Sequence, residues 1–207
     1  QMRIKGLKNT KITKILLTHF HGDHVLGLGG LIRTLGSSAY EKTLEIYGPK
    51  DSKKYFNNLM NSSIFNEKID IVVTELNKGI FFKSDKFRLE CIPLNHSAPC
   101  LGYSFIESDK RKIDLDYLKK FGLTQHPLLG ELQKGKDIEY KGKIIKASKA
   151  TTLVPGKKIT FLIDTGLCKE AIELAKNSDL LVCEATFAET EKEMAKEVKH
   201  LTAKQAA

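Results

Sequence analysis

The chain has 207 residues, enough for one large domain or two small ones with a buried core. Its hydrophobic content of 41% and charged content of 29% are those of a globular protein in water, and no apolar stretch reaches the roughly 20 residues that a membrane helix needs. The formal net charge of +9 favours a polyanionic partner, although lysine-rich surfaces also serve solubility alone.

The first half of the chain predicts strands and helices around a loop rich in histidine. Apolar periodicity indicates a helix at 25–35, ended by Gly36, and an amphipathic helix at 52–65. Strands are expected at 14–18, 44–47, 69–74, 79–82, 87–94 and 101–106.

The second half opens with a basic section, 109–142, which contains a short predicted helix at 115–121 and several helix-breaking residues. Beyond this section, strands are expected at 144–145, 159–163 and 180–183, and helices at 169–176 and 190–199. Hairpins followed by alternating strands and helices predict an α/β (α+β) fold class, with sheets flanked by helices.

Positive charge is concentrated in one part of the chain. Between Asp109 and Lys158 there are 13 Lys or Arg residues against six Asp or Glu, so this quarter carries +7 of the net +9. A basic module apart from the chemistry suits a large anionic substrate that is bound at a distance. On charge alone, a solvated lysine-rich region explains the pattern equally well.

The most informative segment is the run THFHGDH, from Thr18 to His24, which follows the apolar Ile15-Leu16-Leu17. Histidines at alternate positions of a tight loop let two rings converge on one ion, and the following Asp-His pair points the other way, toward a second ion. Neutral imidazole and carboxylate suit zinc, with manganese and iron as alternatives.

Two further ligand candidates stand at the ends of predicted strands. His96 follows the strand at 87–94, and Asp164 follows the strand at 159–163. Alone, a histidine after a strand is usually a capped or surface residue, and Asp-Thr-Gly is a common turn. The histidine loop favours both as ligands, because a metal site gathers side chains from several strand ends. His126, beside Pro127, is interpreted as an ordinary loop histidine.

The pattern His19-x-His21-x-Asp23-His24 resembles the hallmark motif of the metallo-β-lactamase superfamily. Within it, three segments resemble the ribonuclease Z family, endonucleases that remove the 3′ trailer of precursor tRNA. The segment HSAPCLGY at 96–103 is similar to the surroundings of that family's third histidine ligand. The segment CEATF at 183–187 is similar to its H-E-A-T block, with cysteine in place of histidine. The segment HLTA at 200–203 is similar to its H-S-T-A block.

The resemblance implies a metallo-β-lactamase αββα sandwich, with two mixed sheets flanked by helices. It implies a single domain over 1–207 with an inserted basic exosite arm at 109–142. The segment LGELQKG at 129–135 resembles the family's tRNA-binding arm, although His126-Pro127 stands where Gly-Pro is typical. By the family pattern, the opening strands and a final histidine ligand lie outside the sequence, which is interpreted as a fragment.

The resemblance also implies two zinc ions per subunit, with manganese or iron as alternatives. The implied ligands are His19, His21 and His96 for one ion, Asp23 and His24 for the other, and Asp164 as a bridge between them. Asp23 is in addition a candidate acceptor for the proton of the attacking water.

The same resemblance implies that His200 is the acid that protonates the leaving 3′ oxygen, oriented and kept charged by Glu184. The residues alone favour a simpler interpretation. His200 would close the helix at 190–199, where a positive charge is favourable, and Glu184 would cap the next helix. With the family pattern, the catalytic pair is favoured.

The implied partner is precursor tRNA, and the family suggests a homodimer in which the arm of one subunit serves the other's site. The candidate arm lysines for tRNA phosphates are Lys119, Lys120, Lys134 and Lys136. Four scattered cysteines without a C-x-x-C pair indicate reduced thiols, so a cytoplasmic protein without membrane association is expected.

The expected activity is therefore a zinc-dependent endoribonuclease that leaves a 3′-hydroxyl on the tRNA and a 5′-phosphate on the trailer. One alternative is another hydrolase of this fold, acting on a thioester, lactone or phosphodiester, but a small anionic substrate does not need a basic arm. The other alternative is an inactive fragment that binds metal or tRNA.

Overall fold

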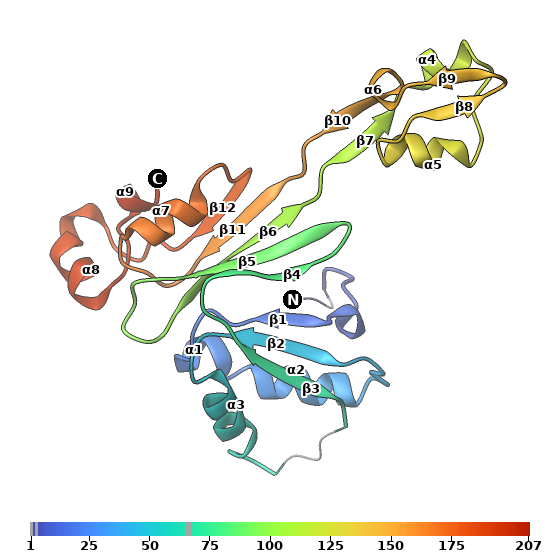
Figure 1. Cartoon of the computed structure of the whole chain (residues 1–207). Helices are drawn as coiled ribbons and strands as arrows, with labels where there is room; N and C mark the ends of the chain where they lie inside the picture. Colours follow the sequence, from blue (N-terminus) through green and yellow to red (C-terminus); the bar gives the residue numbers. More distant parts are fainter. Residues whose placement is uncertain (1, 3, 65–67) are drawn as a thin grey trace.

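The computed structural model describes residues 2, 4–64 and 68–207. In this part of the chain two β-sheets face each other, helices cover their outer faces, and a slender arm projects from the larger sheet (Figure 1). The predicted α/β (α+β) class and the order helix, sheet, sheet, helix are thereby confirmed. Among these residues, no helix combines the length and the apolar content needed to cross a membrane.

The smaller sheet contains β1 (Lys14–Leu16), β2 (Leu44–Gly48) and β3 (Ile71–Glu75) in that order. Its described strand pairs are parallel, so it is not mixed in this part of the chain. Parallel neighbours need crossover connections, which helices supply. These helices are α1 (Gly22–Val25), α2 (Leu28–Gly36) and α3 (Ser52–Met60).

Helices α2 and α3 bury their apolar faces against the smaller sheet. Ile32 and Leu35 of α2 and Phe56 of α3 pack with Leu44 and Ile46 of β2 in one buried cluster. The helix expected at 25–35 is thus divided into α1 and α2 by a two-residue turn, and the helix expected at 52–65 ends at Met60. The predicted end of that helix, residue 65, lies outside the described residues.

The larger sheet is mixed, with the order β12-β11-β6-β5-β4. Its strands are β4 (Gly79–Lys83), β5 (Phe87–Pro93), β6 (Leu101–Glu107), β11 (Lys158–Leu162) and β12 (Leu180–Cys183). Strands β4, β5, β6 and β11 pair antiparallel. The pair β11–β12 is parallel, and α7 (Lys169–Ala175) connects its strands on the outer face.

Alternation along β6 separates the two faces of the larger sheet. Leu101 and Tyr103 pack toward the smaller sheet, where the Tyr103 hydroxyl donates to the Leu17 carbonyl at 2.8 Å. Gly102 faces α7 on the other side, and a Cβ there would lie 2.8 Å from a methyl of Leu174. The sheet therefore packs closely on both faces near the start of β6, next to the segment that bears His96.

The chain after β12 forms the 3-10 helix η2 (Glu189–Glu191), α8 (Lys192–Val198) and α9 (Ala203–Ala206). A capping box begins α9, since Thr202 accepts from the Gln205 amide and donates its own amide to the Gln205 side chain. Another 3-10 helix, η1 (Asn9–Lys11), precedes β1.

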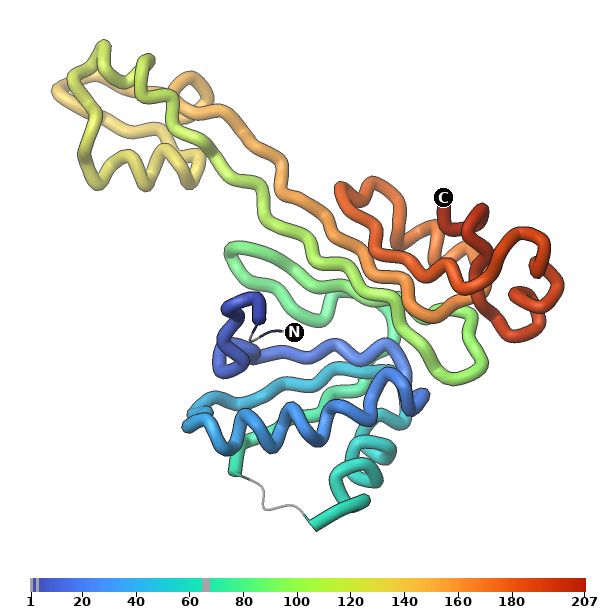
Figure 2. Tube along the Cα trace, turned by 180° about the vertical axis from the view of Figure 1, so that it is seen from behind, coloured from blue at the N-terminus to red at the C-terminus, as the bar shows by residue number. Residues whose placement is uncertain are grey.

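The arm is a separate small unit on a two-stranded stalk (Figures 1 and 2). The stalk pairs β7 (Lys110–Ile113) antiparallel with β10 (Thr151–Val154). The intervening elements are α4 (Leu115–Lys119), α5 (Leu128–Gln133), β8 (Ile138–Tyr140), β9 (Lys143–Ile145) and α6 (Ala147–Ala150). They enclose a core that includes Leu118, Leu123, Leu132, Ile138 and Ile145.

The projecting unit extends beyond the predicted range of 109–142. That range stops at the turn of the β8–β9 hairpin, whereas the chain stays in the arm until β10 returns along β7 to Val154. The returning strand β10 is only four residues long, Thr151–Val154, and its place in the stalk comes from its pairing with the charged strand β7.

Because the arm has its own core, we expect damage to that core to remain in the arm. Leu118→Ala, at a position with no exposed surface, should cost the arm about 2–5 kcal/mol and remove amide protection from hydrogen exchange within 110–154 only. The matched variant Leu35→Ala, equally buried in the sandwich, should affect β1 and β2 instead. If Leu118→Ala also lowered protection in β1 and β2, the two units would be one cooperative structure.

Candidate metal centre

The candidate ligands meet at one rim of the sandwich. Strands β5, β11 and β12 run in the same direction, so their carboxyl ends lie at one edge of the larger sheet. The end of β1 reaches the same rim, where the Leu101 amide donates to the Thr18 carbonyl at 2.9 Å. Residues that follow strands in this way converge without any help from local sequence.

The first ligand set is formed by three imidazoles. His21 Nδ1 lies 3.1 Å from His19 Nε2 and 3.2 Å from His96 Nε2. Ligand nitrogens at about 2.0–2.1 Å from a tetrahedral zinc ion are separated by about 3.3 Å, so this spacing fits such an ion. His19 has no exposed surface and His96 is 8% exposed, which leaves both rings little freedom to move.

Outer contacts set which nitrogen of each buried ring faces the cluster. His19 Nδ1 lies 3.1 Å from the Thr18 hydroxyl, and His96 Nδ1 donates to the Lys199 carbonyl at 3.2 Å. With Nδ1 engaged, the Nε2 of each ring carries the lone pair toward the centre. These contacts orient the Nε2 atoms of both rings toward the cluster of candidate ligands.

The second ligand set centres on Asp164. Its Oδ2 lies 3.1 Å from His24 Nε2 and 3.7 Å from His19 Nε2, so one carboxylate oxygen adjoins both sets. Asp23 is placed differently. Its Oδ2 is 3.4 Å from His24 Nε2, but its side chain is 80% exposed and does not belong to a converging ligand group among the described residues.

Burial favours the neutral form of two histidines of the first set, His19 and His96. Burial, reinforced by the neighbouring imidazoles, lowers the pKa of His19 from 6.5 to about 4. Burial also lowers the pKa of His96, although the Lys199 carbonyl and Asp164 partly oppose it. Neutral imidazoles together with a carboxylate match the donor preferences of zinc, and also of manganese and iron.

Glu184 and His200 form a hydrogen-bonded pair beside the ligand cluster. His200 Nδ1 lies 2.9 Å from Glu184 Oε1, and the His200 and His96 ring centroids are 5.1 Å apart. Burial would raise the pKa of Glu184, but hydrogen bonds from Thr165, Thr186, Leu201 and His200 outweigh it and lower that pKa. Glu184 is therefore an ionised acceptor, not the cap of a following helix.

Backbone contacts tie the loops of the rim to one another. The Thr165 amide donates to Glu184 Oε1 at 2.6 Å, directly after Asp164. The Gly166 amide donates to the Asn95 carbonyl at 2.8 Å, directly before His96. The Cys100 thiol donates to the Asp164 carbonyl at 3.3 Å. The loops that bear the candidate ligands therefore cannot move independently.

The arm lysines named from the sequence differ in their surroundings. Lys119 pairs with Asp116 at 2.7 Å, and Lys134 and Lys136 both pair with Glu131. Lys120 has no ion pair among the described residues. The same is true, within the described ranges, of the exposed lysines 112, 141, 143, 146 and 149. The positive potential of the arm thus comes mainly from lysines that sequence reasoning did not single out.

Sequence reasoning also missed the residues that orient the ligands. Thr18, Cys100 and Lys199 act through a hydroxyl, a thiol and a backbone carbonyl. Thr18 and Cys100 stand within the quoted segments but were given no role there, and Lys199 lies outside them. His126 is an exposed loop residue whose ring accepts a hydrogen bond from the Leu128 amide, which agrees with its interpretation as an ordinary loop histidine. All four cysteines, each within the described residues, are free thiols.

Comparison with known proteins gives consistent matches. Residues 1–108 match the family described as the metallo-beta-lactamase superfamily. The chain is 38% identical over 193 residues to ribonuclease Z of Pyrococcus abyssi, a match that covers 92% of this chain and 63% of the relative. It is 36% identical over 197 residues to ribonuclease Z of Protochlamydia amoebophila, covering 95% of this chain and 64% of the relative. The chain therefore spans less than two thirds of these curated relatives.

A solved structure resembles the whole described fold. The crystal structure of human tRNase Z, short form, aligns with a TM-score of 0.67 and 25% sequence identity. The alignment covers 99% of this chain and 69% of the human protein. The arm and the sandwich are therefore both within the region of similarity.

The lowered pKa of the buried His19 predicts how the stability of the metal-free chain depends on pH. In the metal-free chain, the unfolded state binds a proton below a pKa of 6.5, whereas the folded state resists it until about 4. The free energy of unfolding should therefore fall as pH decreases from about 6.5 to about 4, by at most about 1.4 kcal/mol per pH unit for this proton.

Urea unfolding at several pH values measures this effect as a difference between variants. His19→Gln should flatten the slope between pH 6.5 and 4, while His126→Gln, an exposed loop control, should keep the slope of the parent. Identical slopes in the parent and in His19→Gln would show that His19 is not held neutral by the fold.

Proposed function

The chain belongs to the metallo-β-lactamase superfamily, and we propose that it is a zinc-dependent endoribonuclease that removes the 3′ trailer of precursor tRNA. The observation that carries the proposal is the convergence of His19, His21 and His96 beside Asp164 and the Glu184–His200 pair. The similarity to curated ribonucleases Z over more than nine tenths of the chain supports the substrate class.

The proposed metal ligands follow the two sets of the rim. His19, His21 and His96 would hold one zinc ion, and His24 the other, with Asp164 between them. Asp23 is proposed as a further ligand of the second ion because its carboxylate contacts His24. Its exposed carboxylate is also the candidate acceptor for the proton of the attacking water. When bound, a pair of zinc ions lowers the pKa of water and polarises the scissile phosphate.

The chain's own residues then manage the proton of the leaving group. Cleavage releases the 3′ oxygen of the tRNA, which needs a proton to leave, and His200 stands beside the ligand cluster to supply it. Its Nδ1 lies at hydrogen-bonding distance from Glu184, whose pKa is lowered, and this contact fixes the orientation of the ring. The products would be a 3′-hydroxyl on the tRNA and a 5′-phosphate on the trailer.

The arm suits a substrate that is bound far from the bond that is cut. Strand β6 begins next to the ligand rim and runs away from it into β7, a path of about 40 Å from Leu101 to Ile113 at about 3.3 Å per residue. Figure 2 shows the arm pointing away from the sandwich along this line. An arm that leads away from its own site supports a homodimer in which it serves the partner's site.

Zinc as the metal and a cytoplasmic location are part of the same proposal. The donor set of imidazole and carboxylate supports zinc. The free thiols of the four cysteines support a reducing compartment.

The acid pair is tested by removing either partner. His200→Ala and Glu184→Gln should slow trailer removal by on the order of 10²–10⁴-fold, because a general acid contributes about that much. Both variants should retain the zinc content of the parent, measured by metal analysis, and Glu193→Gln on the exposed side of α8 serves as control. Loss of zinc in either variant would mean that the pair is structural or ligating.

The arm is tested by replacing residues 111–153 with a short Gly-Ser linker. Cleavage efficiency on precursor tRNA should fall on the order of 100-fold, with a shallower salt dependence, because phosphate contacts are lost. Hydrolysis of bis(p-nitrophenyl) phosphate should stay within about threefold, since the ligand rim is intact.

Charge substitutions provide the matched control for the deletion. Exchanging the unpaired lysines 141, 143 and 146 for glutamine should weaken tRNA binding and lower the salt slope by about 2–3, at about 0.7–0.9 per phosphate. Exchanging the ion-paired lysines 119, 134 and 136 should have a smaller effect. Equal losses on tRNA and on the small diester after deletion would show that the arm is structural.

A further inference from the structure

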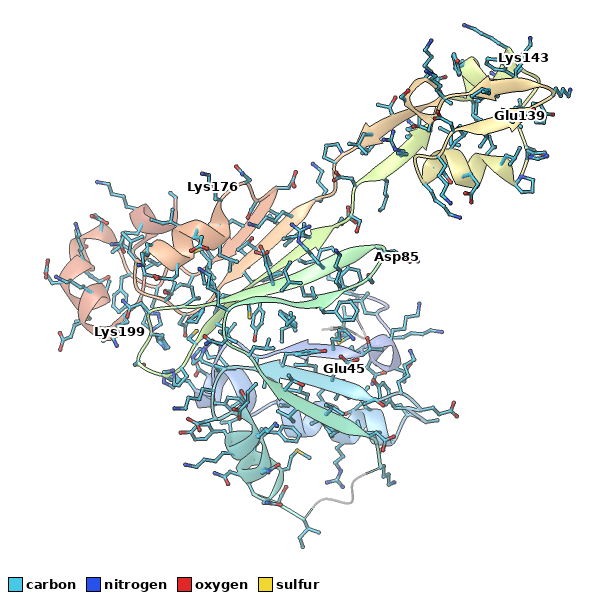
Figure 3. All side chains as sticks on the ribbon, in the orientation of Figure 1. Glu45, Asp85, Glu139, Lys143, Lys176 and Lys199 are labelled. Atoms are coloured by element: carbon cyan, nitrogen blue, oxygen red, sulfur yellow. The ribbon has the colours of Figure 1, made fainter. Side chains whose placement is uncertain are left out.

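We propose that Lys199 is a positioning residue that fixes His96 in its ligand orientation, an inference that rests on the metal-dependent function proposed above. Lys199 is the C-cap of α8 and has left-handed backbone angles, with φ 58° and ψ 53°. Figure 3 shows it at the end of α8, close to the loop that follows β5. This backbone conformation turns the chain so that Lys199 faces His96, 103 positions earlier in the sequence.

Lys199 contacts His96 at two points. Its carbonyl accepts from the ring Nδ1 at 3.2 Å, and its Nζ donates to the His96 carbonyl, also at 3.2 Å. The first contact selects the neutral tautomer whose lone pair is on Nε2, and the second fixes the backbone from which the ring extends. The backbone carbonyl and the side chain of Lys199 therefore restrain the ring and the backbone of His96, respectively.

The position of Lys199 is itself restricted by the Asp164 loop. A Cβ added to Gly166 would lie 3.3 Å from Lys199 Cα and 3.3 Å from Asn95 Nδ2, so there is no spare room between these loops. The Gly166 amide also donates to the Asn95 carbonyl. Lys199 is thus packed against the residues that flank His96 and Asp164, which makes its two contacts with His96 well defined.

The same turn places the proposed acid. His200 follows Lys199 directly, its amide donates to the Ala195 carbonyl at 2.8 Å, and its ring lies 5.1 Å from the ring of His96. A change at Lys199 would therefore affect both the candidate ligand His96 and the proposed acid His200. The lysine acts through these two histidines and is not itself placed at the reacting phosphate.

The test uses zinc alone as the probe. Lys199→Met keeps the length of the side chain but loses the donor, and we expect zinc affinity, measured by competition with a chromophoric chelator, to fall by about tenfold. The absorption spectrum of the cobalt-substituted protein should change as well, because it reports ligand geometry. Lys199→Arg, which retains a cationic donor, should restore both readouts to near the parent.

The matched control is Lys196→Met, which removes an exposed lysine one turn earlier on α8. It should leave zinc affinity and the cobalt spectrum unchanged, and its denaturant midpoint should equal that of Lys199→Met. An equal fall in zinc affinity in both methionine variants would reflect only lost charge and would overturn the proposal. Parental zinc binding in Lys199→Met with weaker tRNA binding would overturn it too, by indicating a substrate contact.

These readouts are independent of nuclease activity. If Lys199→Met loses zinc affinity while the parent binds zinc without removing a trailer, the positioning role stands and the proposed function fails. If the parent removes trailers and Lys199→Met binds zinc as the parent does, the proposed function stands and the positioning role fails.

Discussion

One imidazole nitrogen within hydrogen-bonding distance of the nitrogens of two other imidazoles is the constraint on which the rest of the structure depends. His21 Nδ1 is 3.1 Å and 3.2 Å from the Nε2 atoms of His19 and His96, so the rings cannot all carry charge. Burial keeps the pKa of His19 near 4 and makes the neutral form the stable one. The fold thereby prepares lone pairs for a cation, at the cost of a cluster that is intolerant of acid.

The direction of the strands and the hydrogen bonds between loops hold the three imidazoles together. Parallel alignment of β5, β11 and β12 brings the segments after them to one rim, and the Tyr103 hydroxyl ties the end of β1 to the larger sheet. The groups that orient the two buried rings, the Thr18 hydroxyl and the Lys199 carbonyl, come from segments far apart in the sequence. The ligand geometry is therefore a property of the whole rim and not of one loop.

The proposed function assigns substrate binding to the arm and the chemistry to the ligand rim. It has its own apolar core and joins the sandwich through two strands, so its exposed lysines can change without disturbing the ligand rim. Ion pairs with Asp116 and Glu131 already neutralise part of its charge. The arm lysines without an ion pair among the described residues remain for a polyanion, and the arm projects away from the two sheets (Figure 1).

The sequence by itself determined the histidine loop, the fold class and the strand ends at which His96 and Asp164 stand, because apolar periodicity and a dense local motif are readable over a few residues. Tertiary structure alone decided the C-terminal limit of the arm, since residues 143–154 join it through the pairing of β9 with β8 and of β10 with β7. It also decided the exposure of Asp23 and the contacts of Lys199 with His96. Those contacts use the backbone carbonyl and the side-chain amine of a lysine 103 positions from His96. Because every residue has a backbone carbonyl, no local sequence pattern predicts them.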